Sequence, residues 1–377
     1  MSEAVIAGYA RSPFTPARKG ALAKVRPDEL MAQVVCGLLK QSSVNPAELE
    51  DLIIGCAFPE GEQGLNVARI VGFLADLPVS VAGTTVNRFC GSSMQAIHMA
   101  AGAIAAGAGE AFVCGGIESM TRVPMMGFNP LPHPGLCERA PEIFISMGLT
   151  AENLAQKHEI TREAQEAFAL ESQKRTARAA SDGSFSDEII VIENGGSVAT
   201  DGCPRPDTSL EALAALKPAF DANGSVTAGT SSPLTDGAAA VLVTSVDYAK
   251  RNKLPVMAHI RATAVSGCAP EIMGIGPVEA ARKALGRAGL ELGQMDLVEL
   301  NEAFAAQSLA VLGELGLSHG KVNLDGGAIA LGHPLGASGA RITGKAASLL
   351  QREGGKYALA TMCIGGGQGI ATVLEAA

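Results

Sequence analysis

The chain has 377 residues, enough for two or three ordinary domains or for one large duplicated unit. Its 47% of hydrophobic residues, 18% of charged residues and 45 glycines indicate closely packed elements and argue against disorder. The formal net charge of -9 disfavours a general nucleic-acid binder, because neutralising phosphates requires clustered lysine and arginine. An anionic small ligand needs only a local basic patch and is not excluded.

The N-terminus and the longest apolar run both argue against export and against a membrane span. The first residues, MSEAVIAGYARSPF, lead into a strand-like run without the charged region, apolar region and cleavage site of a secretory signal. The apolar run 91–109 is rich in Gly, Ala and Ser, which favours a buried helix. The eight cysteines contain no CxxC pair. We therefore expect reduced thiols, a cytoplasmic location and no metal site.

Helices and strands are predicted to recur in the same order in the two halves of the chain. ELMAQVVCGLLKQSSVNPAELEDLIIGC reads as helix, turn and a strand from Asp51, and VEAARKALGRAGLELGQMDLVELNEAF repeats this order with a strand from Asp296. Each half then continues with a Gly/Ser turn, a small-residue helix and a strand ending near Cys-Gly. Alternating strands and helices predict α/β layers, and two copies predict two packed halves with a site at their junction.

Cys90 stands between an extended-looking segment and the first small-residue helix, in VNRFCGSSMQ. Little of a free thiol is ionised at neutral pH, because its pKa is about 8.5. The N-terminus of a helix offers free N–H groups and partial positive charge, which can lower that pKa. Gly91 leaves room for a ligand. The motif indicates a reactive nucleophile, and a small buried apolar side chain is the alternative.

Residues 118–233 differ from both halves. The segment opens with the Pro- and Met-rich MTRVPMMGFNPLPHPGL, continues with two polar helices and ends in turn-rich sequence. We interpret it as an inserted loop or lid domain, after which the buried strand DGAAAVLVTS returns to the first half. The predicted domains are therefore 1–117 plus 234–255, the insertion 118–233, and 256–377.

Two polar motifs of the second half stand where chemistry is expected. Asn301 follows a predicted strand in ELNEAFAAQ, where its amide can hold a water or donate to an oxyanion, although Asn-Glu also starts ordinary helices. His333 lies in GGAIALGHPLGASGAR, whose glycines and proline predict a tight loop that fixes the imidazole beside a ligand. A turn histidine satisfied by backbone is the alternative. His98, on the apolar helix, is expected to be a packed core histidine.

Cys363 ends a predicted strand before the glycine-rich loop of MCIGGGQG. Successive backbone N–H groups in such a loop can face a developing oxyanion. The run lacks the last glycine of a dinucleotide fingerprint. GARITGKA matches GxxxxGK but continues with Ala346 and lies in a predicted helix, so it is not a phosphate-binding loop.

Together with GGIESM, MGLTAENLA, LKPAFD and VTAGTSSPLTDGAAA, these motifs resemble the thiolase family along essentially the whole chain. The resemblance implies a five-layered α/β fold of two βαβαβαββ halves with a loop domain inserted in the first. It implies thiolytic cleavage of 3-ketoacyl-CoA by CoA, giving acetyl-CoA and a shortened acyl-CoA, with no bound cofactor.

The resemblance also assigns roles to the catalytic residues. The nucleophile falls on Cys90, the histidine base on His333, and the general acid/base on Cys363. Asn301 would hold a water in one oxyanion hole, and the backbone N–H groups of Cys90 and Gly365 would form the other.

Coenzyme A contacts would fall on Ser232, Phe220 and Arg205, and Met147 would lie in the substrate pocket. Short-chain biosynthetic thiolases have a histidine before that methionine, where this chain has Ser146 in SMGLTAEN. CGSSMQ also resembles degradative enzymes more than the CGSG of biosynthetic ones. We therefore expect a β-oxidation thiolase that accepts substrates longer than four carbons. The Met- and Pro-rich loop is expected either to line an acyl channel or to be a packed loop.

Several other functions compete with this interpretation. A short-chain acetoacetyl-CoA thiolase has the same fold, and a ketoacyl synthase usually has two histidines where this chain has His333 and Cys363. A non-catalytic lipid carrier would tolerate loss of Cys90, and a Cys-His-Asn peptidase leaves Cys363 unexplained. Family members are homodimers or homotetramers, some with a hydratase/dehydrogenase subunit, so a homo-oligomer is expected.

Overall fold

The first half of the chain folds as a βαβαβαββ unit in the computed structural model, which describes residues 3–377. Its strands pair in the order β4-β3-β5-β8-β1; β3 is parallel to β4 and β5, and β8 is antiparallel to β5 and β1. Its elements in chain order are β1 (Ala4–Arg11), α1 (Pro27–Ser42), β3 (Asp51–Gly55), α2 (Val67–Leu74), β4 (Ala82–Val86), α3 (Ser92–Ala105), β5 (Ala111–Ser119) and β8 (Thr235–Ser245).

The second half repeats this order with one difference. Its strands pair as β10-β11-β12-β9, and in place of a counterpart to β4 it has a single parallel bridge between Val298 and Val322. Its elements are β9 (Ala258–Gly267), α9 (Gly276–Ala288), β10 (Leu297–Leu300), α10 (Ala305–Leu315), α11 (Ala328–Leu331), α12 (Ser338–Glu353), β11 (Tyr357–Ile364) and β12 (Gln368–Ala376). The duplication predicted from the sequence is confirmed.

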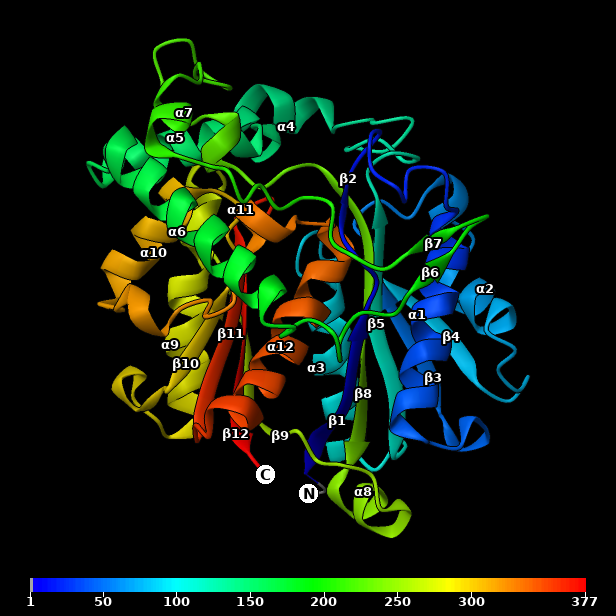
Figure 1. Ribbon diagram of the computed structural model, residues 1–377. Helices are drawn as coiled ribbons and strands as arrows, with labels where there is room; N and C mark the ends of the chain where they lie inside the picture. The colour runs from blue at the N-terminus through cyan, green and yellow to red at the C-terminus, as the bar shows by residue number, and fades with distance from the viewer. Residues whose placement is uncertain (1–2) are drawn as a thin grey trace.

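Five layers result from stacking the two halves (Figure 1). Helices α1 and α2 cover one half-sheet, α9 and α10 cover the other, and α3 and α12 lie between them. Side chains that alternate along β3 fit this layering, because Leu52 and Ile54 enter the outer apolar core while Ile53 enters the central one. The strands of a sheet that is covered on both faces have nearly continuous apolar sequences. The half-sheets join through a short antiparallel pairing of β1 with β9.

The insertion runs from the end of β5 to the start of β8 and packs mainly on the second half. Helix α6 contacts α10 and α11, and α5 contacts α10 (Figure 1). The strand at 235–245 returns to pair with β1 and β5, as the sequence predicts. The inserted elements are α4 (Pro134–Arg139), α5 (Met147–Lys157), α6 (Arg162–Ser181), β6 (Ile192–Glu193), β7 (Ser197–Val198) and α7 (Leu210–Ala214), and the short β2 (Thr15–Pro16) and α8 (Val246–Asn252) lie outside it.

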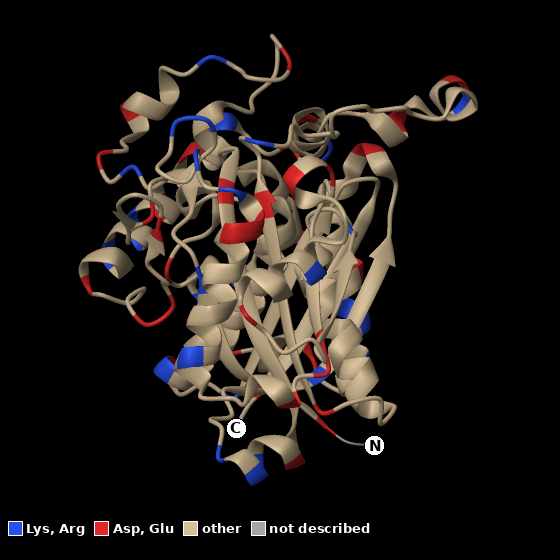
Figure 2. Cartoon of the chain, turned by 90° about the vertical axis from the view of Figure 1, so that its right-hand side faces the viewer, with Lys and Arg blue, Asp and Glu red and all other residues tan. Residues whose placement is uncertain are grey.

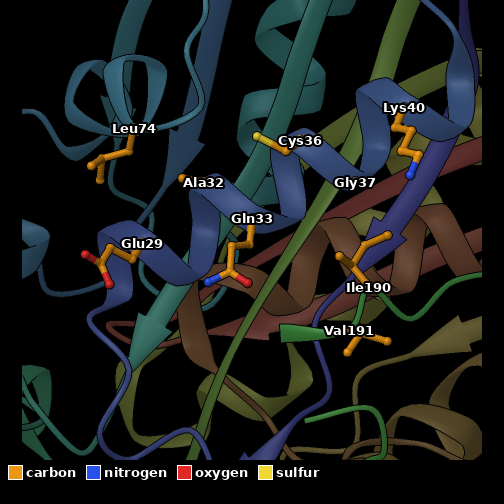
Figure 3. A pocket seen from close by; sticks show the side chains of 9 residues that line it. All are labelled: Glu29, Ala32, Gln33, Cys36, Gly37, Lys40, Leu74, Ile190 and Val191. Carbon is orange, nitrogen blue, oxygen red and sulfur yellow. The ribbon is translucent and has the colours of Figure 1, made fainter. Parts of the chain in front are cut away.

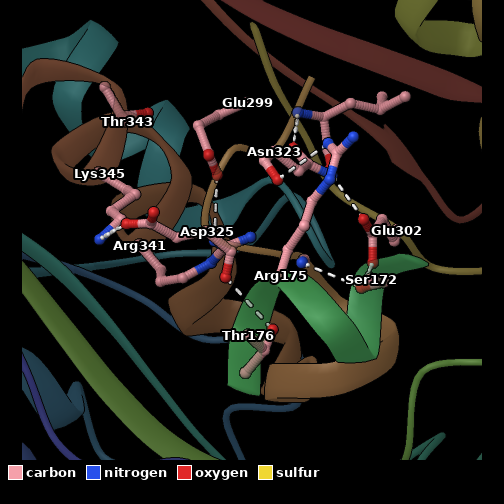
Figure 4. A network of polar contacts seen from close by, with 12 residues as sticks. Ser172, Arg175, Thr176, Glu299, Glu302, Asn323, Asp325, Arg341, Thr343 and Lys345 are labelled. Atoms are coloured by element: carbon pink, nitrogen blue, oxygen red, sulfur yellow. Dashed lines mark hydrogen bonds and ion pairs between the residues drawn. The ribbon is translucent and has the colours of Figure 1, made fainter. Parts of the chain in front are cut away.

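Charged residues gather on the outer helices and loops, and the central strands are largely free of them (Figure 2). Helix α12 is an exception, because it carries charge into the middle layer. Lys345 pairs with Glu188 at 3.0 Å and Asp325 at 2.7 Å, and Arg341 pairs with Glu299 at 3.1 Å. Figure 4 shows Lys345, Asp325, Arg341 and Glu299 beside the polar contacts of α6. Glu188 belongs to the insertion and also pairs with Arg11 of β1 at 2.7 Å, so its ion pairs hold the insertion to both halves.

We predict that Lys345→Met lowers the free energy of unfolding by about 3 kcal/mol, because it leaves two buried carboxylates short of a partner. Urea denaturation measures this. The control, Lys283→Met, removes an exposed pair with Glu279 and should change stability by less than about 0.5 kcal/mol. Equal effects of the two substitutions would contradict the prediction.

Candidate active site

Cys90 lies in the short connection between β4 and α3, as its motif predicts. The turn is held by Ser92, whose hydroxyl accepts from the Arg88 N–H at 2.9 Å and donates to the Phe89 carbonyl at 2.6 Å. Phe89 has a φ of 43°, a conformation that is costly for a bulky residue. A Cβ on Gly91 would lie 2.6 Å from Ile364, so this glycine allows the turn to approach β11.

His333 lies in a buried loop between α11 and α12. Its backbone N–H donates to the Thr235 hydroxyl at 3.0 Å, and its Nδ1 lies 2.6 Å from the Ser338 hydroxyl. Ser338 donates its own proton to the Pro334 carbonyl at 2.9 Å. The hydroxyl must therefore accept from Nδ1–H, which leaves Nε2 as the unprotonated nitrogen. The Asn301 amide donates to Nε2 at 3.3 Å.

A single cavity of about 170 Å³ brings the predicted catalytic groups together. Cys90 from the first half and His333 and Cys363 from the second half all line it. Other parts of its wall come from the insertion and from neighbouring loops; the remaining lining residues are Met120, Met125, Ser146, Met147, Gly148, Phe220, Ser231, Ser232, Pro233, Leu234, Met273, Ala303, Phe304 and Leu335.

Burial keeps the reactive groups of this cavity uncharged at rest. Desolvation raises the pKa of Cys90 to about 12, and the nearby Glu118 carboxylate also raises it, although the backbone N–H of Gly365 opposes the shift. Burial also raises the pKa of Cys363 far above its usual range and lowers the pKa of His333 to about 3. The expectation that the helix N-terminus lowers the pKa of Cys90 is wrong for the free protein, because desolvation outweighs it.

The other predicted site residues differ in how close they lie to this cavity. Met147, Phe220 and Ser232 line it. The backbone N–H of Gly365 lies close enough to the Cys90 thiol to lower its pKa, against the effect of burial. Arg205 does not line it; this residue is exposed, and its backbone N–H donates to the Gln173 side chain at 2.8 Å.

The Met- and Pro-rich loop was expected either to line an acyl channel or to be a packed loop. Met125 lines the cavity, and Met125, Met126 and Phe128 are all exposed. Ser338 was not singled out, although it lies five residues after His333 at the first position of α12. His98 is half-buried and bonds to Thr372 at 2.8 Å, in agreement with its predicted structural role.

A second hollow, of about 440 Å³, lies on the outer face of α1 (Figure 3). Its walls, as far as the structure describes them, include Cys36 and Lys40 but no histidine. Burial raises the pKa of the Cys36 thiol. Without a base beside it, this thiol has no means of activation comparable to that of Cys90.

The duplicated fold, with a thiol, an imidazole and a second thiol around one cavity, is that of an α/β enzyme. The model of the thiolase N-terminal domain matches residues 4–247, and that of the thiolase C-terminal domain matches residues 254–376. The chain belongs to the thiolase family.

Named relatives match along their whole length. The chain is 47% identical to the 3-ketoacyl-CoA thiolase of Bacillus subtilis and 50% identical to that of Aliivibrio fischeri, with complete coverage of both chains. Among solved structures, human mitochondrial 3-ketoacyl-CoA thiolase in complex with CoA is 40% identical, with a TM-score of 0.92, over 100% of this chain and 98% of that one. The Bacillus anthracis acetyl-CoA acetyltransferase is 41% identical, with a TM-score of 0.91, over 100% and 99%.

We predict that His333 carries its proton on Nδ1 and stays neutral from pH 8 down to pH 5, because burial disfavours the imidazolium. Nitrogen NMR of labelled histidine measures both properties.

Ser338→Ala removes the acceptor for Nδ1–H and should lower kcat about tenfold, as expected for one lost hydrogen bond. Ser42→Ala, which removes a remote buried hydroxyl bonded to the Leu38 carbonyl, is the matched control. A protonated Nε2 in the wild-type protein would contradict the assignment.

Proposed function

We propose that this protein cleaves 3-ketoacyl-CoA with CoA to give acetyl-CoA and an acyl-CoA shortened by two carbons. The observation that carries the proposal is the meeting of Cys90, His333 and Cys363 in one cavity between the two halves. The names of the full-length relatives support the same substrate class. CoA is then a co-substrate and not a resident cofactor.

In the first half-reaction, the unprotonated Nε2 of His333 takes the proton of Cys90, and the thiolate attacks C3 of the substrate. The N–H groups of Cys90 and Gly365, both of which lower the pKa of the Cys90 thiol, would stabilise the C3 oxyanion. The bond between C2 and C3 then breaks, and its electron pair leaves as the enolate of acetyl-CoA. Asn301, directly or through a water, stabilises the enolate oxygen, and Cys363 protonates C2.

In the second half-reaction, the Cys363 thiolate takes the proton of an incoming CoA. The CoA thiolate attacks the acyl group on Cys90, and the Cys90 thiolate leaves and recovers its proton from His333. Both cysteines and the histidine return to their starting protonation states. The cycle needs no oxidant, reductant or metal ion. A buried site suits it, because thiolates formed there are short-lived and remain poorly solvated.

We predict that the wild-type protein, incubated briefly with acyl-CoA, gains one acyl group on Cys90, as measured by mass spectrometry of its peptides. Cys90→Ala should show no such adduct and should lose thiolysis. Cys363→Ala should still be acylated by a good acyl donor but should turn over poorly, because the enolate lacks its proton donor. Near-normal thiolysis by Cys90→Ala would rule out the mechanism.

We further propose that the protein acts in β-oxidation on substrates longer than four carbons. Four methionines line the cavity, Met120, Met125, Met147 and Met273, and methionine adapts to flexible apolar chains. Ser146 occupies the wall position that biosynthetic thiolases give to a histidine. The likeness to an acetyl-CoA acetyltransferase keeps the acetoacetyl-CoA reaction as the second candidate. The lipid-carrier alternative is not favoured, since the complete set of reactive groups is present.

We predict that kcat/KM in a series of 3-ketoacyl-CoA substrates from four to twelve carbons rises beyond four carbons. Each additional methylene group in contact with the cavity contributes about 1 kcal/mol, which raises kcat/KM several-fold, so the trend is measurable. Activity confined to acetoacetyl-CoA would reject the degradative assignment in favour of the second candidate.

Contacts to CoA are proposed for Phe220 and Ser232, which line the cavity, and for the exposed Arg205, whose charge suits a phosphate. We propose the domains predicted from the sequence, which are 1–117 plus 234–255, the insertion 118–233, and 256–377.

We also propose a homodimer or homotetramer in the cytoplasm, with a hydratase/dehydrogenase subunit as a further partner. The free edge of β4 and the 90% exposed Leu65 near it support self-association. Among residues 3–377, every helix is too short or too polar to cross a membrane.

A further inference from the structure

Glu118 is a fully buried carboxylate near the end of β5 and does not line the cavity. All of its hydrogen-bond partners are donors. Oε2 accepts from the backbone N–H groups of Ala57 at 2.8 Å and Gly336 at 2.9 Å. Oε1 accepts from the Phe58 N–H at 3.3 Å and the Gln63 side chain at 2.9 Å. An ionised carboxylate can accept all of these hydrogen bonds, whereas a neutral side chain of the same shape cannot.

The two donors on Oε2 come from opposite halves of the molecule. Ala57 follows β3 in the first half, and Gly336 belongs to the loop of the second half that carries His333. The two halves approach each other very closely here, because a Cβ on Gly116 would lie 2.0 Å from the Gly336 carbonyl oxygen. One oxygen atom therefore holds the His333 loop at a fixed distance from the first half.

A chain of hydrogen bonds continues from this oxygen to the nucleophile. The Ala57 carbonyl accepts from the Asn87 side chain at 3.0 Å, and the Asn87 side-chain oxygen accepts from the Phe89 N–H at 2.8 Å. Phe89 is the residue with positive φ directly before Cys90. The path from the His333 loop to the Cys90 turn thus runs through Gly336, Glu118, Ala57 and Asn87.

We propose that Glu118 is a positioning residue that sets the distance between Cys90 and His333 by joining their two loops through one carboxylate. The proposal rests on the function proposed above but concerns a residue that touches neither substrate nor reacting atoms. The geometry between nucleophile and base is sensitive, because a displacement of about 1 Å costs on the order of 100-fold in rate. A change at Glu118 should therefore affect the chemical steps more than substrate binding.

The test replaces Glu118 by glutamine, which has the same shape but directs an NH₂ group at backbone donors. In the full-length protein, Glu118→Gln should lower kcat of thiolysis by about 10- to 100-fold and leave KM for CoA within about twofold. A readout that does not require turnover is alkylation by iodoacetamide, mapped by mass spectrometry. The rate at Cys90 should fall relative to the exposed Cys36, which serves as the internal reference, because the loss of positioning by His333 outweighs the small gain from removing the Glu118 charge.

Asn87→Ala provides a second variant, because Asn87 is exposed and its loss should leave the fold intact. It interrupts the same path and should lower kcat about tenfold with the same change in the alkylation ratio. Glu152→Gln is the matched control, since this carboxylate also accepts two backbone N–H groups, of Ser225 and Val226, but lies in the insertion. It should leave both readouts unchanged.

An unchanged kcat together with an unchanged alkylation ratio, in a folded Glu118→Gln or Asn87→Ala, overturns the proposal. If Glu118→Gln fails to fold, Asn87→Ala decides alone. A wild-type protein without thiolase activity would refute the proposed function, whereas the alkylation ratio would still test the role of Glu118.

Discussion

The active site depends on the contact between the N-terminal ends of α3 and α12. A Cβ on Gly339 would lie 2.4 Å from the backbone nitrogen of Met94, so only glycine lets the two helices approach so closely. The Ser93 hydroxyl accepts from the Ala340 N–H at 2.8 Å across the same contact. Because both helices begin at this end of the molecule, the loops preceding them, and with them Cys90 and His333, are brought to one place.

Burial has opposite consequences for the reactive groups and for the ion pairs of α12. In the cavity it leaves a neutral thiol beside a neutral imidazole, since an unpaired charge there is costly. On α12, the buried Lys345 has two carboxylates within 3.0 Å and the buried Arg341 has one at 3.1 Å, and these partners offset the cost of burial. In the proposed mechanism, charge thus appears in the cavity only while substrate and oxyanion donors are in place to stabilise it.

The sequence predicted the duplication, because strand and helix periodicity and glycine-rich turns are local signals. The grouping of Cys90, His333 and Cys363 into one site was predicted only from the resemblance to the thiolase family, and the structure brings the three to one cavity. The sequence did not predict that the counterpart of β4 in the second half is reduced to a single bridge between Val322 and Val298 of β10. So short a pairing depends only on the contact with β10. Nor did the sequence predict the direction of the Cys90 pKa shift, which depends on burial. Glu118 was missed because one polar residue ending an apolar strand does not reveal which loops it will join.

The cavity wall has two origins, and this has a consequence for how such an enzyme diversifies. The three side chains proposed to be catalytic come from the halves, where tight glycine contacts tolerate almost no change. Met125, Met147 and Phe220 come from the insertion, which adds walls without carrying the chemistry. Mutations in the insertion can therefore alter which acyl chains are accepted while the bond-breaking steps stay the same. Laboratory evolution aimed at new substrates has most to gain from that segment.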